Sequence, residues 1–209
     1  LSDTFGLAHI ASFDKHKISY YTREGFDFFY PGYGSSYPSL MGSIGMLVEQ
    51  GGHSRGGRAV ETDDGYVLTL RQRIFDHYET SFATLSAAVR NRRELNQYLF
   101  DSFKQNTNKS KSKAYILPDN KDGYLYDVLN LMRFHGVEIE QATSDFMVNK
   151  AYDYETGKSS RKVFKKGDFI INGNQPRHLF VNTLFQREME IEDSICLLYT
   201  SDAADDPTC

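Results

Sequence analysis

The sequence predicts a protein of the α/β class, organised as two units joined by a linker. Between residues 68 and 103 apolar residues recur every three to four positions, which is the period of an amphipathic helix. After Ala114, short apolar runs alternate with a helix-like stretch, in the order strand, helix, strand that is typical of a parallel sheet. Each unit is therefore expected to combine helices with a sheet.

The first unit, residues 1–104, contains a glycine-rich segment followed by a long helix. Pro31–Gly57 holds eight of the sixteen glycines, which indicates backbone that turns sharply or approaches another segment closely. Within it, Ser43–Gln50 is an apolar run that predicts a buried strand with Glu49 at its exit. One face of the following helix, or of two helices in series, is formed by Ile74, Tyr78, Phe82, Leu85 and Val89.

The second unit, residues 114–195, follows a polar and basic linker at residues 105–113. Residues 114–117, 137–140 and 168–171 are expected to be strands, and residues 124–134 and 176–185 helices. Gly136 occupies the position of a helix C-cap, and Pro176 is expected in the first turn of the last helix. These elements predict a parallel sheet covered by helices.

Composition excludes several classes of protein. The chain has 209 residues and a formal net charge of -4, and this mildly acidic balance argues against a nucleic-acid partner. No apolar run approaches the roughly 20 residues of a membrane span. The two cysteines, Cys196 and Cys209, are too few for a disulfide framework or a cysteine-rich zinc site.

Both ends of the sequence indicate that the chain is a fragment of a longer protein. The chain begins with Leu1, without an initiator methionine or the pattern of a signal peptide. At the other end, Cys196–Asp206 resembles the translation of a transposase-type sequencing adapter. We therefore expect residues 196–209 to be a non-native tail and native coding to stop near Ile195.

The glycine-rich segment lacks the common nucleotide-binding and serine-hydrolase motifs. Gly32 and Gly34 would need a third glycine at position 37 for a dinucleotide fingerprint, but Tyr37 stands there, and no Gly-Lys-Ser/Thr loop is present. Pro38 interrupts a nucleophile elbow after Ser35 and Ser36. The remaining feature is a glycine- and tyrosine-bearing loop followed by an apolar run that ends in Glu49.

This feature resembles the zinc carboxypeptidase family, the funnelins typified by carboxypeptidase A. The loop Tyr33-Gly-Ser-Ser-Tyr37 is similar to the family's loop with a mobile tyrosine, and Met46-Leu-Val-Glu49 is similar to the strand that ends in its catalytic glutamate. Glu49 follows Tyr33 by sixteen positions, a shorter spacing than in carboxypeptidase A and similar to that of bacterial members with Pro-Gly-Tyr-Gly. The resemblance extends over roughly residues 26–103 and implies the C-terminal part of a mixed-sheet metallocarboxypeptidase domain.

The resemblance assigns a role to each of these residues. Glu49 would be the general base and then the general acid acting on a zinc-bound water, and Tyr33 would bind the C-terminal carboxylate of a peptide or protein substrate, with Tyr37 as the competing tyrosine. It also implies export to the periplasm or the outside of the cell. The sequence does not specify the side-chain preference or the oligomeric state.

The zinc ligands that the family provides are not apparent in this sequence. The one His-x-x-Glu match, His135 to Glu138, lies at a predicted helix-to-strand junction after Glu49 in the chain, whereas the family's pair precedes the glutamate. His53 follows Glu49 and is interpreted as a surface-loop histidine or a lining residue of the cleft. We expect the zinc ligands upstream of Leu1, so that this chain alone has no metal ligand and no activity.

The second unit resembles a class I glutamine-amidotransferase-like domain, on the residues 167–185 and on the domain order. An active amidotransferase needs a nucleophilic cysteine at the strand-to-helix turn, but Gly173-Asn-Gln-Pro176 contains none. The resemblance therefore implies an accessory domain without catalysis. Two alternatives remain for the whole protein: a peptide- or glycan-binding pseudoenzyme of the same fold, and an α/β hydrolase that uses Ser35 or Ser36.

Overall fold

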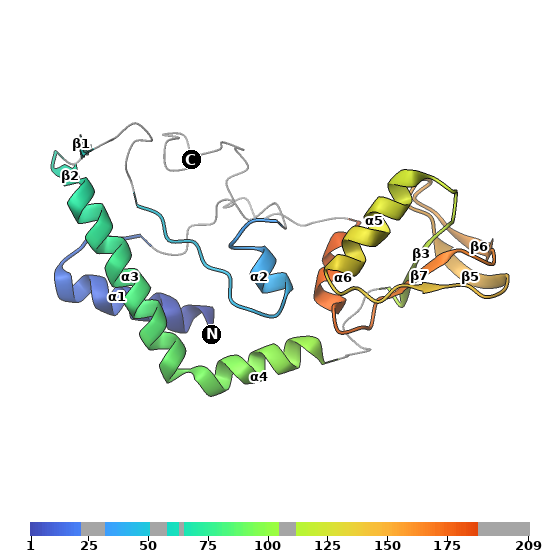
Figure 1. Ribbon diagram of the computed structural model, residues 1–209, viewed down its shortest axis with the longest axis horizontal. Coiled ribbons are helices and arrows are strands. Elements are labelled where there is room, and N and C mark those ends of the chain that lie inside the picture. Colours follow the sequence, from blue (N-terminus) through green and yellow to red (C-terminus); the bar gives the residue numbers. More distant parts are fainter. Residues whose placement is uncertain (22–31, 51–57, 63–64, 105–111, 188–209) are drawn as a thin grey trace. The chain divides into compact units, whose positions relative to one another are not determined.

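A computed structural model describes residues 1–21, 32–50, 58–62, 65–104 and 112–187. The chain forms two compact units, Leu1–Leu99 and Phe100–Met189, each containing helices and small sheets (Figure 1). The predicted α/β class is therefore confirmed in its general form. The aromatic run before Pro31, His53, residues 105–111 of the expected linker and the expected tail at residues 196–209 lie outside the described residues.

A pair of packed helices forms the centre of the first unit. Helix α1 (Ser2–His16) packs against α3 (Leu70–Arg90), and α4 (Arg92–Phe103) continues from α3 after a one-residue break (Figure 1). Two helices in series were one of the two predicted alternatives for this region, whereas the sequence pattern did not reveal α1. Thr69 begins α3 because its hydroxyl accepts a hydrogen bond from the Gln72 amide at 3.2 Å.

The side of α3 that packs against α1 is the polar one. His9 Nε2 lies 2.7 Å from Thr84 Oγ1, and Ser12 Oγ donates to Glu79 Oε2 at 3.0 Å. The predicted apolar face is instead between 51 and 65% exposed. Its members are Ile74, Tyr78, Phe82, Leu85 and Val89. The periodicity thus identified the helix correctly but not the face that α1 covers.

Three short elements complete the first unit. Strands β1 (Ala59–Glu61) and β2 (Val67–Thr69) form an antiparallel hairpin that leads directly into α3. Helix α2 (Tyr37–Leu40) is a single turn in the glycine-rich segment. The strand expected over residues 43–50 is not observed: residues 44–50 have no regular secondary structure, and no described strand pairs with them.

The second unit contains a three-stranded sheet in the order β3-β7-β4. Strand β3 (Ala114–Leu117) and strand β4 (Glu140–Gln141) both pair antiparallel with β7 (Phe169–Asn172). The prediction of a parallel sheet is therefore wrong for these strands. β3 and β4 do run in the same direction on either side of α5 (Gly123–Phe134) in the chain, but β7 lies between them, which makes a split β-α-β unit.

Helices α5 and α6 (His178–Leu184) cover one face of this sheet. Tyr126 of α5 makes an edge-on ring contact with Phe169, and Tyr115 of β3 donates a hydrogen bond to Asn182 Oδ1 of α6 at 2.9 Å. The core that results is apolar. Its most buried members include Leu129, Met132, Val137, Phe169, Ile171 and Val181.

A second sheet in this unit was not predicted. Strands β5 (Phe146–Tyr152) and β6 (Ser159–Phe164) form an antiparallel hairpin with an irregular register between Val148 and Ala151.

Among the helices in the described part of the chain, none is long and apolar enough to cross a membrane.

Candidate functional site

The tyrosine loop is a compact turn closed by backbone hydrogen bonds. The Tyr33 carbonyl accepts hydrogen bonds from the amides of Ser36 at 3.1 Å and Tyr37 at 2.8 Å. The chain then makes the single turn of α2, and the amide of Ser43 donates to the carbonyl of Pro38 at 2.8 Å. These bonds close one turn of backbone that has Tyr33 at its start and Tyr37 at its end.

Ser39 and Gly45 fasten the next segment to this turn. The Ser39 hydroxyl donates to the Ser35 carbonyl at 3.4 Å and accepts from the Gly45 amide at 3.2 Å. A Cβ atom at position 45 would lie 2.9 Å from Ser39 Oγ and would overlap the Ser35 carbonyl, so no side chain fits there. The close approach that the glycine content indicated therefore occurs at Gly45.

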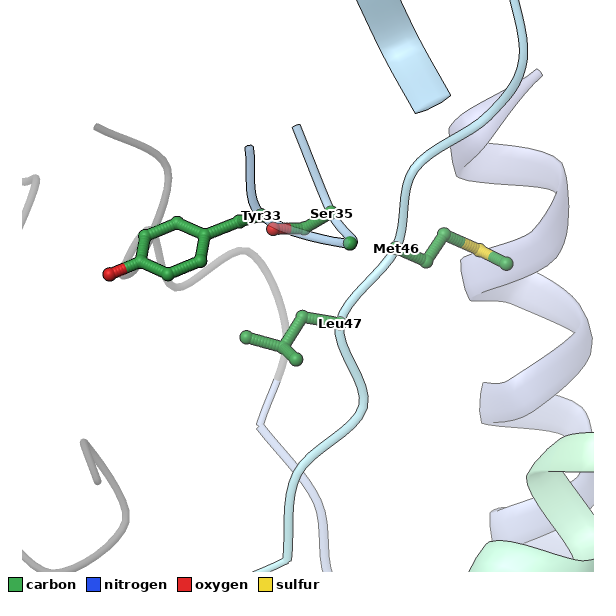
Figure 2. A pocket seen from close by; sticks show the side chains of 5 residues that line it. Tyr33, Ser35, Met46 and Leu47 are labelled. Carbon is green, nitrogen blue, oxygen red and sulfur yellow. The ribbon is translucent and has the colours of Figure 1, made fainter. Parts of the chain in front are cut away.

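The two fastened segments border an open pocket of about 290 Å³. Its lining comes from both, namely Tyr33, Gly34, Ser35, Met46 and Leu47. Figure 2 shows that Met46 and Leu47 point to opposite sides of the chain, with Leu47 on the side of the Tyr33 ring. The tyrosine loop and the residues that precede Glu49 are thus brought together around one hollow.

The structure places the three predicted site residues differently. Tyr33 is half-buried and lines the pocket, while Tyr37 begins α2 and is half-buried outside the lining. Glu49 is exposed, two residues beyond Leu47. The expectation that Glu49 ends a buried strand is therefore wrong, because residues 44–50 lack the pairing that would bury them.

The residue after Glu49 is anchored to α3. Gln50 Nε2 donates a hydrogen bond to Asp76 Oδ2, and Gln72 Nε2 donates to Asp76 Oδ1 at 2.6 Å. Asp76 is only 4% exposed. Sequence reasoning missed this carboxylate because it lies on the polar face of an amphipathic helix, where charged residues are usually solvated.

The described residues do not form a zinc site. Among them, no group of three histidine, cysteine, aspartate or glutamate side chains is placed to hold a metal ion. In the His135-x-x-Glu138 match, the His135 ring contacts the rings of Phe134 and Phe180, while Glu138 is exposed.

The histidines of α1 take part in helix packing. His16 Nδ1 lies 3.5 Å from Glu79 Oε2, and the His16 ring meets Phe75 edge-on. Burial lowers the pKa of His9, which contacts Thr84. These contacts give both rings a structural role between α1 and α3.

The strand-to-helix turn of the second unit is filled by a glutamine. Gln175, 1% exposed, accepts a hydrogen bond from the Glu138 amide at 2.7 Å and donates to the carbonyls of Glu138 and Asn172. Pro176 precedes the N-cap residue Arg177, so its predicted place in the first turn of α6 is wrong by about two residues. The turn joins three parts of the unit and offers no nucleophile.

No protein-family model matches the chain, and no curated protein or solved structure matches it either. The function is therefore inferred from the residues between Tyr33 and Glu49 and from their arrangement beside α3.

Proposed function

We propose that this chain is part of a bacterial zinc metallocarboxypeptidase that hydrolyses the C-terminal peptide bond of peptides or proteins. The observation that carries the proposal is the pocket between the tyrosine loop and residues 46–47. Two parts of one family motif, separated in sequence, border the same hollow and are fastened by Ser39 and Gly45. Such convergence is what substrate positioning requires.

Glu49 is the proposed general base and acid. Glu49 is exposed and follows Leu47, which lines the pocket, by two positions. Its carboxylate would take a proton from the attacking water and deliver that proton to the amine that leaves the scissile bond. An exposed carboxylate can exchange protons with both the water and the amine.

Tyr33 is the proposed ligand of the substrate's terminal carboxylate. It lines the pocket on the loop side, and a phenol hydroxyl can donate a hydrogen bond to a carboxylate. Tyr37 lies one turn further on and outside the lining, which favours Tyr33 for this role. The zinc ion implied by the family resemblance finds no site among the described residues.

The test uses the polypeptide made from this chain together with its upstream coding sequence, assayed for release of the last amino acid from N-blocked dipeptides. Glu49→Gln should lower kcat by about 100- to 10,000-fold with bound metal unchanged, because proton transfer to a positioned base contributes on the order of 10²–10⁴-fold. Tyr33→Phe should chiefly raise KM, and Tyr37→Phe should not. Glu61→Gln, an exposed carboxylate on β1, is the matched control.

Retained turnover by Glu49→Gln would overturn the assignment. Wild-type protein that binds peptide or glycan without hydrolysing it would establish the pseudoenzyme instead. Labelling of Ser35 or Ser36 by a fluorophosphonate, together with activity that a zinc chelator leaves unchanged, would establish the serine hydrolase.

A further inference from the structure

The chain segment that carries Glu49 has two attachments, one at its start and one at its end. Gly45 fastens its start to the tyrosine loop, and Gln50 fastens its end to α3 through Asp76. The position of Glu49 is thus set between two fixed points. Glu49 itself lies one residue before the second of them.

The second attachment is built around a buried carboxylate. Asp76 accepts hydrogen bonds at both carboxylate oxygens, from the side chains of Gln50 and Gln72. The backbone amide of Gln72 in turn donates to the hydroxyl of the cap residue Thr69. A carboxylate that is 4% exposed is costly unless its oxygens are hydrogen-bonded, so losing the Gln50 bond leaves an uncompensated buried acceptor.

The geometry limits how far Glu49 can move. Gln50 is held on α3 by its bond to Asp76, and Glu49 is the residue directly before it. Glu49 also follows Leu47, which borders the pocket, by two positions. The other atom of the Gln50 amide group, Oε1, is buried without a hydrogen-bond partner among the described residues, so the bond to Asp76 is what holds this side chain.

We propose that Gln50 and Asp76 are positioning residues, which hold Glu49 in its catalytic orientation by tying the end of its segment to α3. This inference rests on the proposed function of Glu49. It adds that the amide-carboxylate pair acts on the rate of the chemical step and not on substrate binding, because neither side chain lines the pocket.

The decisive variant is Gln50→Glu, which sets two carboxylates against each other where an amide now donates to one. Asp76→Asn alone is less informative, because the Gln50 amide can rotate and accept from the new amide group. In the exchanged pair, Gln50→Glu with Asp76→Asn, position 76 can donate to Glu at 50 and still accept from Gln72. The hydrogen bond is then restored with its direction reversed.

With the upstream sequence present, Gln50→Glu should lower kcat by about 100-fold and change KM by less than about threefold, since small displacements of a catalytic group have effects of this size. The exchanged pair should recover kcat to within about threefold of wild type. Thr80→Val, which is also buried on α3 one turn away and has no bond to Gln50, should keep the wild-type kcat.

A second measurement does not depend on activity. Backbone hydrogen exchange over residues 43–50 of the full chain should be faster in Gln50→Glu and return to the wild-type rate in the exchanged pair. Unchanged exchange in Gln50→Glu, or faster exchange with unchanged kcat, overturns the positioning role. Faster exchange that the exchanged pair reverses, in an upstream-extended protein without any peptidase activity, supports the anchor and refutes the proposed function.

Discussion

Gly45 lies directly against the backbone carbonyl of Ser35, so closely that a Cβ atom at position 45 would overlap the carbonyl oxygen. The Gly45 amide also donates to the Ser39 hydroxyl, which itself donates to the same Ser35 carbonyl. This contact fixes the distance between the two walls of the pocket. It makes residue 45 the most sterically restricted glycine of the site.

Gly45→Ala is expected to destabilise the first unit by about 1–3 kcal/mol, the usual cost of overpacking, because the Ser35 carbonyl belongs to backbone and cannot move aside freely. Urea unfolding followed by far-UV circular dichroism measures this. Gly34→Ala is the control: Gly34 lies in the same pocket, but a Cβ there meets nothing within 4 Å. Equal unfolding midpoints for the two variants would contradict the packing described here.

Local signals in the sequence predicted the candidate site, but they did not predict its exposure. The glycine content indicated a close approach, and the motif placed Tyr33 and Glu49 near one another in the chain. Whether Glu49 is buried depends on a strand partner for residues 44–50, which is a long-range property that no spacing encodes. The same holds for Gln50, whose partner Asp76 is 26 positions away.

The two faces of α3 should respond oppositely to substitution. Ala87 is 1% exposed on the buried side, so Ala87→Leu is expected to destabilise the first unit by about 1–3 kcal/mol. Leu85 is 61% exposed, so Leu85→Gln is expected to change stability by less than about 0.5 kcal/mol. Thermal unfolding of each variant checks both values, and a large loss for Leu85→Gln would show that its face is covered in solution.

The burial of the polar face of α3, in place of its apolar face, shows what periodicity can and cannot predict. A spacing of three and four residues reports only which side chains share a face, and for α3 it was correct. Which face becomes buried depends on the partner, and α1 presents His9 and Ser12, which bind Thr84 and Glu79. In the second unit, likewise, the order β3, α5, β4 was predictable, whereas the insertion of β7 between the strands was not.

Gly136 ends α5 in a way that requires a glycine. Its φ is +79°, its amide donates to the Arg133 carbonyl at 2.9 Å, and the Val137 amide donates to the Met132 carbonyl at 3.0 Å, which together form a Schellman motif. Gly136→Ala should destabilise the second unit by roughly 1 kcal/mol or more, because alanine disfavours positive φ and its Cβ would lie 3.2 Å from Arg177 Nε.

Gly123, at the other end of the same helix, provides the comparison. A Cβ at Gly123 meets nothing within 4 Å, and the residue begins α5 without a positive φ. Gly123→Ala should therefore be neutral or stabilise the unit by up to about 1 kcal/mol, since alanine reduces the entropy of the unfolded chain. Denaturant midpoints of both variants, read from NMR signals of the second unit, test the difference. A similar loss at both positions would contradict the capping role of Gly136.

Asp153 is expected to titrate well below an ordinary aspartate. Hydrogen bonds from the Thr156 amide and then from Lys162 Nζ, each at 3.0 Å, lower the pKa of its carboxyl to about 2, and the Glu155 amide adds a further bond. NMR titration of the Asp153 carboxyl carbon measures this value. A pKa near the model-compound value of 3.8 would show that the turn between β5 and β6 is not formed in solution.

The lowered pKa also sets the pH range over which the Asp153 carboxylate stabilises this hairpin. Because the folded carboxyl has the lower pKa, the unfolded state binds more protons, so the stabilisation is complete above about 3.8 and is lost as the pH falls toward about 2. Asp153→Asn should abolish this part of the acid transition. Lys162→Met should raise the pKa only part of the way, because the bonds from the Thr156 and Glu155 amides remain. A complete return to the ordinary value in Lys162→Met would instead assign the whole shift to the ion pair.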